Sequence, residues 1–293
     1  MLLVPFAPGG IADLTARAVA EHMSKSLGQP VVVENKPSAG SIVASQAVAT
    51  AKPDGHTLLL MSNGNAVSVG LFKKLPYDTV RDLVPVTTLG YFDIGLFASA
   101  TANARFATLR DVLAFARANP GKLNVGTIAP GSTQHLSAKL FETVAGVDML
   151  VVPYKGSPGV LTALRAGEID IAFEIVGPMV PQVSAGVVKA LAVSSDKRNP
   201  ALPEVPTVQE AGLAGYNVAS WNALAAPAGT PPEVLDKLGR AAREAVASPE
   251  VQAKLGKLGM RLAGSTQAQA QALLVGEIKR WGDVIRAAKI EPE

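Results

Sequence analysis

The chain has 293 residues, of which 48% are hydrophobic and 5% aromatic, and its 27 basic and 24 acidic residues give a formal charge of +3. This size and apolar content suffice for one large domain or two ordinary ones and argue against disorder. The lack of cysteine excludes disulfides, thiolate nucleophiles and cysteine-based zinc sites. A small charge excess without a dense basic run argues against nucleic-acid binding.

The first part of the chain alternates between strand and helix patterns. We predict strands over residues 2–6, 30–34 and 57–61, and helices over 11–27 and 41–51. Residues 62–65 are expected to form a loop that closes the third strand. This order predicts a parallel sheet with right-handed crossovers. Because Met1 to Pro5 resemble the interior of a strand and show no signal-peptide pattern, we expect the natural chain to begin further upstream.

The same alternation recurs in the middle of the chain. We predict helices over 108–118, 131–144, 156–166 and 180–185, and strands over 123–127, 149–152, 169–173 and 188–193. Thr108 is the expected N-cap of the first of these helices, with Asp111 three residues later. The junctions Val4-Pro5-Phe6…Gly9-Gly10 and Val152-Pro153-Tyr154…Gly156 resemble each other, as expected for two similar α/β lobes.

The C-terminal part has a different character. Residues 217–226 form an extended stretch, and three helices follow with N-terminal signals at Thr230 to Glu233, at Ser248, and at Thr266 to Gln269. We therefore predict an α/β, two-lobed architecture with a mainly parallel sheet in each lobe. Lobe one comprises residues 1–97 and 224–293, lobe two comprises 98–223, and the ligand cleft lies between them. The chain would cross twice, near 92–98 and 216–223, which suits a hinge.

Catalytic residues are scarce in this sequence. None of the three histidines, His22, His56 and His135, has an evident metal partner, and we expect no metal or cofactor. Ser132 precedes His135 near a helix start, so an α/β hydrolase-like enzyme acting on a small carboxylate or ester is an alternative. The nucleophile elbow G-x-S-x-G is absent, however, and helix capping explains Ser132 equally well.

Several strand ends carry small or polar residues that suit an anion. Loops at residues 7–10, 62–65 and 131–135 offer backbone amides and hydroxyls, and residues 154–156 add an aromatic ring and a charge. In open α/β sheets, ligands bind at the carboxyl ends of strands. Such groups bind a carboxylate and break no bond. Alternatives remain open: plain tight turns for the glycines, a helix-dipole role for Asp13, and solvent exposure for Lys155 and Glu174.

The sequence resembles the Bug-type (tripartite tricarboxylate transporter) extracytoplasmic solute-binding proteins over nearly its whole length. The resemblance rests on segments distributed along the chain. These are Val4 to Gly10 with Asp13, Leu27 to Lys36, Pro53 to Leu59, Leu75 to Asp78, Val152 to Gly156, Leu202 to Thr207, and Trp221 with the Pro227 to Pro231 stretch. Ile11 and Ala12 depart from the family, which often has a small or hydroxyl residue there, and suggest a more apolar pocket wall.

The resemblance implies a Venus-flytrap fold, a periplasmic location and delivery of a solute to membrane permease subunits by a monomeric, non-catalytic protein. It implies a small organic carboxylate as ligand: a dicarboxylate, an acidic amino acid or an aromatic acid. The expected ligand-binding residues are Phe6, Ala7, Pro8, Gly9, Gly10, Asp13, Ser62, Asn63, Asn65, Ser132, Thr133, Gln134, His135, Tyr154, Lys155, Gly156 and Glu174.

Overall fold

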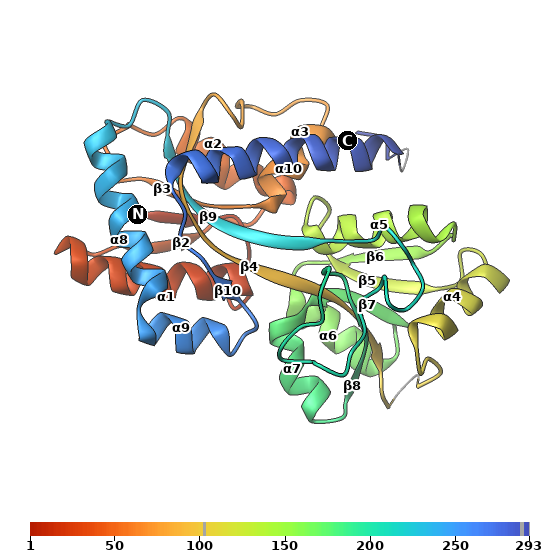
Figure 1. Cartoon of the computed structure of the whole chain (residues 1–293). Coiled ribbons are helices and arrows are strands. Elements are labelled where there is room, and N and C mark those ends of the chain that lie inside the picture. Colours follow the sequence, from red (N-terminus) through yellow and green to blue (C-terminus); the bar gives the residue numbers. More distant parts are fainter. Residues whose placement is uncertain (102–103, 288–289, 293) are drawn as a thin grey trace. The chain divides into compact units, whose positions relative to one another are not determined.

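The computed structural model describes residues 1–101, 104–287 and 290–292, and these form two compact units (Figure 1). Unit 1 comprises residues 1–91 and 221–293, and unit 2 comprises residues 92–220. The chain passes between the units inside two strands, β4 (Leu83–Ser99) and β9 (Ala219–Pro227). The unit boundaries therefore fall at 91/92 and 220/221, compared with the expected 97/98 and 223/224.

Unit 1 is built on a mixed sheet with the strand order β2-β1-β3-β9-β4. The strands β1 (Leu2–Val4), β2 (Val33–Asn35) and β3 (Leu58–Ser62) are parallel, β9 runs antiparallel to β3, and the short β10 (Arg261–Leu262) pairs with β4. The helices of this unit are α1 (Ile11–Leu27), α2 (Ile42–Ala49), α3 (Asn63–Leu71), α8 (Pro232–Ala247), α9 (Pro249–Gly256) and α10 (Gln267–Ala287), with a 3-10 turn η1 (Ala39–Ser41) before α2.

The helices of unit 1 cover both faces of its sheet. The connections β1–α1–β2 and β2–α2–β3 run in opposite directions across the sheet, so right-handed crossovers place α1 and α2 on opposite faces. Figure 1 shows α1 near α8 and α9, and α2 near α3 and α10, in agreement with the helix contacts. One core cluster joins α2 and α10 to the sheet through Ala44, Leu59, Met61, Trp221 and Leu274.

Unit 2 contains the second α/β sheet. Its strands β5 (Asn124–Ile128), β6 (Leu150–Tyr154) and β7 (Ile171–Ile175) are parallel in the order β7-β5-β6. The second half of β4 pairs antiparallel with β7 and with β8 (Val188–Val193). Each parallel strand leads into a helix: α5 (Thr133–Ala145), α6 (Ser157–Ala166) and α7 (Val176–Ser184) follow β5, β6 and β7, while α4 (Leu109–Ala118) precedes β5.

Helix starts and stops confirm much of the local prediction. Thr108 and Asp111 form a capping box on α4, and the side chain of Ser248 caps α9. Gly28 ends α1 in the left-handed conformation that favours glycine. The expected N-cap at Thr230 is wrong by one residue, because α8 begins at Pro232 and the Thr230 hydroxyl donates instead to the carbonyl of Pro227.

Two elements differ from the prediction in kind. Residues 63–71 form the helix α3, although their small and polar residues suggested only a loop at 62–65. Residues 83–99 form one long strand, β4, which the sequence did not indicate. In the part of the chain that the structure describes, no helix is both long and apolar enough to cross a bilayer.

Candidate ligand-binding site

In unit 1, two predicted segments lie at the same edge of the sheet. The strand β1 leads through residues 5–10 into α1, and the adjacent parallel strand β3 leads through Ser62 into α3. Gly9 has φ +85°, a conformation that favours glycine, and Gly10 is the N-cap of α1 without a side chain to bond the first amides. The N-terminus of α1 therefore keeps amide donors that can bind an anion.

Asp13 fixes the loop in front of α1. Its carboxylate accepts hydrogen bonds from the backbone N–H of Gly9 at 3.0 Å, from Arg17 Nε at 3.0 Å and from Asn35 Nδ2 at 2.9 Å, and Asn35 Nδ2 also donates to the carbonyl of Phe6 at 3.0 Å. Burial raises the pKa of this carboxyl, but the hydrogen bonds and the Arg17 charge outweigh burial and bring the pKa below its ordinary value. Asp13 is thus an anchor for the loop.

The polar residues at the start of α3 are held from inside unit 1. Asn65 accepts from the backbone N–H of Ser62 at 2.9 Å as part of a capping box with Ser62, and its side chain also donates to Ser45 Oγ at 2.7 Å. Asn63 accepts from Trp281 Nε1 at 2.9 Å. Both asparagine side chains are completely buried. They shape the helix start, and the groups of this segment that remain for a ligand are mainly those of the backbone.

In unit 2, three helix starts lie side by side at the carboxyl edge of the sheet, because β7, β5 and β6 are neighbours and parallel. Ser132 caps α5 by accepting from the backbone N–H of His135 at 3.1 Å. The hydroxyls of Thr133 and Ser220 are 2.8 Å apart, which ties α5 to the start of β9. This edge combines amides with hydroxyls, as expected for a site that binds carboxylate oxygens.

Glu174 is the most deeply buried ionisable side chain at this edge. Its Oε2 accepts from the backbone N–H of Ile175 at 2.8 Å and from Gln134 Nε2 at 3.4 Å, while Oε1 has no hydrogen-bond partner among the described residues. Burial raises the pKa of Glu174 against the opposing effect of its hydrogen bonds to the Ile175 N–H and to Gln134. The shift is toward the neutral acid relative to an exposed glutamate, and Glu174 links the starts of α5 and α7.

The segment between β6 and α6 is more open. Tyr154 is half-buried and packs against Gly159, while Lys155 is exposed. Gly156 is the N-cap of α6 in an extended conformation (φ 178°, ψ 170°), and no side chain caps this helix. Gly10 and Gly156 therefore occupy equivalent places in their units, as the repeated strand–proline–aromatic–glycine pattern predicted.

Neither a catalytic pair nor a metal site forms from the histidines. His135 Nδ1 is 3.3 Å from Thr127 Oγ1, while the Ser132 hydroxyl lies 3.5 Å from the carbonyl of Ile128, so each contacts a structural partner. Burial, with a further contribution from the Lys139 charge, lowers the pKa of His135 to about 4. Across residues 1–101, 104–287 and 290–292, no cluster of three or more acidic or histidine side chains can hold a metal ion.

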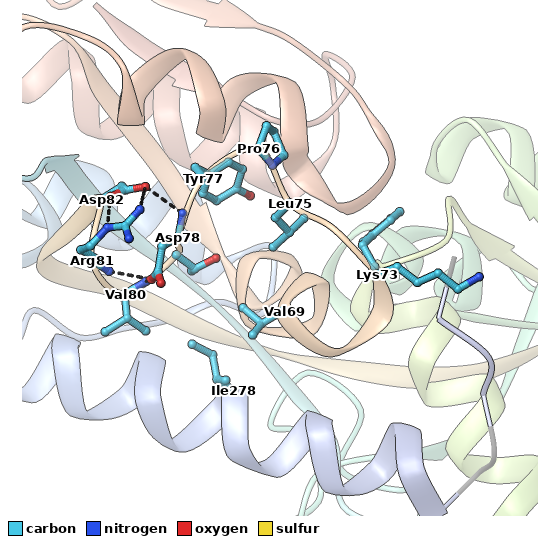
Figure 2. A pocket seen from close by; sticks show the side chains of 12 residues that line it. Val69, Lys73, Leu75, Pro76, Tyr77, Asp78, Val80, Arg81, Asp82 and Ile278 are labelled. Carbon is cyan, nitrogen blue, oxygen red and sulfur yellow. Dashed lines mark hydrogen bonds and ion pairs between the residues drawn. The ribbon is translucent and has the colours of Figure 1, made fainter.

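A separate pocket of about 630 Å³ lies in unit 1 beside α3 and α10 (Figure 2). It shares no residue with the predicted site. Arg81 points to Asp82, with its Nε 2.7 Å from Asp82 Oδ1, and Asp78 lies next to this pair. The charged residues that line this pocket are Lys73, Asp78, Arg81 and Asp82, and Arg81 is already paired with Asp82, so we assign the pocket no role in solute binding.

The sequence did not point to several polar residues that lie at the carboxyl edges of the sheets in unit 1 and unit 2. Asn35 holds both Asp13 and the Phe6 carbonyl, Ser220 contacts Thr133, and Asn222 is opposite Ser62 in the β3–β9 ladder. Asn35 is the last residue of the parallel strand β2 and was therefore recognisable by the rule that selected the other strand ends. Asn222 lies inside an extended stretch, and only the strand register places it here.

The sequence matches the tripartite tricarboxylate transporter family receptor (TctC) over residues 15–290. The chain belongs to this family. The BugT protein of Bordetella pertussis is 34% identical over 97% of the chain and 87% of its own length. A second B. pertussis protein is 37% identical and covers the whole chain and 90% of its own length.

Similar solved structures confirm the predicted fold class, the periplasmic-binding-protein fold. The periplasmic binding protein BugD has a TM-score of 0.92 at 31% identity, covering 100% of this chain and 98% of its own. An R. palustris protein with adipate has a TM-score of 0.93 at 33% identity, covering 100% and 98%. MatC from Rhodopseudomonas palustris, with bound malate, has a TM-score of 0.89 at 34% identity, covering 97% and 98%. The protein is therefore a solute-binding protein of the Bug type and not an enzyme.

Proposed function

We propose that the protein binds a small organic carboxylate through the helix starts of both units and delivers it to a tripartite tricarboxylate-type permease. The observation that carries this proposal is the pair of uncapped helix N-termini at Gly10 and Gly156. Each offers backbone amides to an anion and needs no charged side chain. The adipate and malate bound by two relatives are carboxylates of this size class.

The proposed location follows from the family. BugD is a periplasmic binding protein, and a receptor for a membrane transporter must meet its solute on the outer side of the permease. We therefore propose that this protein works in the periplasm as a monomer, with the permease subunits as partners. We further propose that the residues on the predicted list in each unit are the candidates for contact with the solute.

A matched pair of substitutions tests both halves of this proposal. Gly10 and Gly156 have backbone angles that valine also adopts, and an added Cβ would meet only Ala7 O at 3.9 Å or Pro158 Cδ at 3.7 Å. Gly10→Val and Gly156→Val should therefore fold normally and place a branched side chain over the amides of α1 or α6. Ala107→Val, at an exposed residue before α4, is the control.

The assay is a thermal-shift and calorimetric screen against mono-, di- and tricarboxylates and acidic amino acids, on protein that has been unfolded and refolded to remove carried-over solute. A ligand present at 100 times its dissociation constant stabilises the fold by about 2.7 kcal/mol. We expect at least a tenfold loss of affinity in each glycine variant and none in Ala107→Val. Unchanged affinity in either variant would refute binding through that helix start, and no binding by refolded wild type would refute carboxylate capture.

A further inference from the structure

Asn222 in β9 carries a buried hydrogen-bond acceptor that the protein does not use. Its side chain is completely buried, and Oδ1 has no hydrogen-bond partner among the residues that the structure describes. Its Nδ2 donates to the carbonyl of Trp221 at 3.2 Å. If the Asn222 amide were flipped, Oδ1 would face the Trp221 carbonyl, and two acceptor oxygens would meet. The bond from Nδ2 therefore fixes the orientation of the amide and leaves Oδ1 as the unused atom.

The strand register places this oxygen on the α1 side of the sheet in unit 1. Leu59, Met61, Trp221 and Ala223 all contribute to the core cluster on the α2 and α10 side. Side chains alternate between faces along a strand, and Asn222 lies between Trp221 and Ala223, so its side chain points to the opposite face, where α1 lies.

Asn222 also lies at the carboxyl edge of this sheet. Its ladder partner is Ser62, the last residue of β3, and the adjacent strand β1 leads into the loop before Gly10 and α1. The unused acceptor and the uncapped amides of α1 are therefore on the same face and at the same edge of unit 1.

The chemistry of these two groups is complementary. The amides of α1 are donors and suit a carboxylate, whereas the Asn222 oxygen is an acceptor and gains nothing from another carboxylate oxygen. A buried acceptor is satisfied only by an O–H or N–H group. We propose that the solute is a hydroxy- or amino-substituted carboxylate and that Asn222 accepts a hydrogen bond from its hydroxyl or amino group. This inference rests on the proposed carboxylate-binding function and specifies the class of acid.

Pairs of acids that differ by one substituent test this proposal. The probes are L-malate and L-aspartate against succinate, and 2-hydroxyglutarate and L-glutamate against glutarate, titrated calorimetrically into refolded wild-type protein. A site built to bond a hydroxyl or amino group discriminates strongly against the analogue that lacks it, because its polar group is then left unpaired. We expect the substituted acid to bind at least tenfold more tightly in one or more pairs.

The variant Asn222→Leu has a similar size and lacks the acceptor, so it should reduce that preference to within about threefold while the unsubstituted acid binds as before. Asn222→Ala serves the same purpose if leucine disturbs folding. The control is Asn124→Leu, in β5 of unit 2, where residue 124 is at the opposite end of its strand from the helix start.

Three results would overturn the inference. Equal binding of substituted and unsubstituted acids by wild type would mean that water or nothing fills the place beside Asn222. A preference that survives in both Asn222 variants would assign recognition to another residue. If no acid binds to the wild type, the proposed function fails and this inference fails with it, a result that is distinct from binding without preference.

Discussion

Replacing Asp13 with alanine is expected to destabilise unit 1 by about 3 kcal/mol. The carboxylate is almost fully buried and accepts bonds from the Gly9 N–H and from Asn35 Nδ2, and alanine leaves both donors without this acceptor. Hydrogen bonds to charged groups contribute about 1.5–3 kcal/mol each, and losses at one carboxylate are not fully additive. Because the Arg17 side chain is half exposed, we assign none of the expected loss of stability to its ion pair with Asp13.

Urea unfolding followed by tryptophan fluorescence measures this effect in the right part of the molecule. Both tryptophans, Trp221 and Trp281, are buried in unit 1, which also contains Asp13. A loss of about 3 kcal/mol lowers the urea midpoint by roughly 1 M. The control, Asp236→Ala, removes an exposed acid on α8 and should change the free energy of unfolding by less than about 0.5 kcal/mol.

The pH dependence of the same measurement has a defined sign. Since the pKa of Asp13 is lowered in the folded protein, its contribution is present above the ordinary aspartate pKa and is lost as the pH falls through the folded-state pKa. The difference between wild type and Asp13→Ala should therefore shrink in acid. Equal midpoints for Asp13→Ala and Asp236→Ala at neutral pH would refute the assignment of Asp13 as the anchor of the loop.

Three other substitutions test the interior of the two units. Since burial raises the folded-state pKa of Glu174, its contribution is present at low pH and is lost as the pH rises through that pKa. Wild type should therefore lose stability relative to Glu174→Gln as the pH rises above the ordinary glutamate pKa, by at most about 1.4 kcal/mol per pH unit in thermal melts; parallel curves would contradict this. Asn65→Ala removes a capping box and a buried bond to Ser45, so urea unfolding should show a loss of about 2 kcal/mol, and a loss below 0.5 would contradict the role of the box. Phe141→Ala removes a buried ring that contacts two others edge to face, at 5.6 and 5.9 Å, and should cost about 3–5 kcal/mol in urea unfolding of the whole protein followed by circular dichroism. A loss below 1 kcal/mol would show that this core repacks.

The sequence predicted those features that depend on neighbouring residues. Strand–glycine–helix junctions at Gly10 and Gly156, and the caps at Thr108 and Ser248, are local patterns, and the structure confirms them. The helix α3 was missed because its residues favour a loop locally. It is stabilised by a distant partner, since Asn63 at its start accepts a hydrogen bond from Trp281 in α10.

The sequence did not predict in which direction the polar side chains at the strand ends point. Asn65 and Asp13 look alike as polar residues next to glycine-rich strand ends, and both were candidates for direct ligand contact. The structure uses both to hold backbone in place, through Ser62 and Gly9 respectively. Whether such a residue points inward depends on the register of strands far apart in the chain, which no local pattern specifies.

The supporting role of these side chains bears on how the protein could distinguish one acid from another. On the proposed function, backbone amides at α1 and α6 donate to any carboxylate, whereas polar side chains such as Asp13 and Asn65 are saturated by bonds inside unit 1. Discrimination between acids must then come from the few buried polar atoms that remain unsaturated. Asn222 Oδ1 in unit 1 and Glu174 Oε1 in unit 2 are two such atoms among the described residues. An amide oxygen and a carboxyl group make different demands on a solute, so substitutions at these two positions should change which acid binds, whereas those at Asp13 or Asn65 should weaken all acids alike.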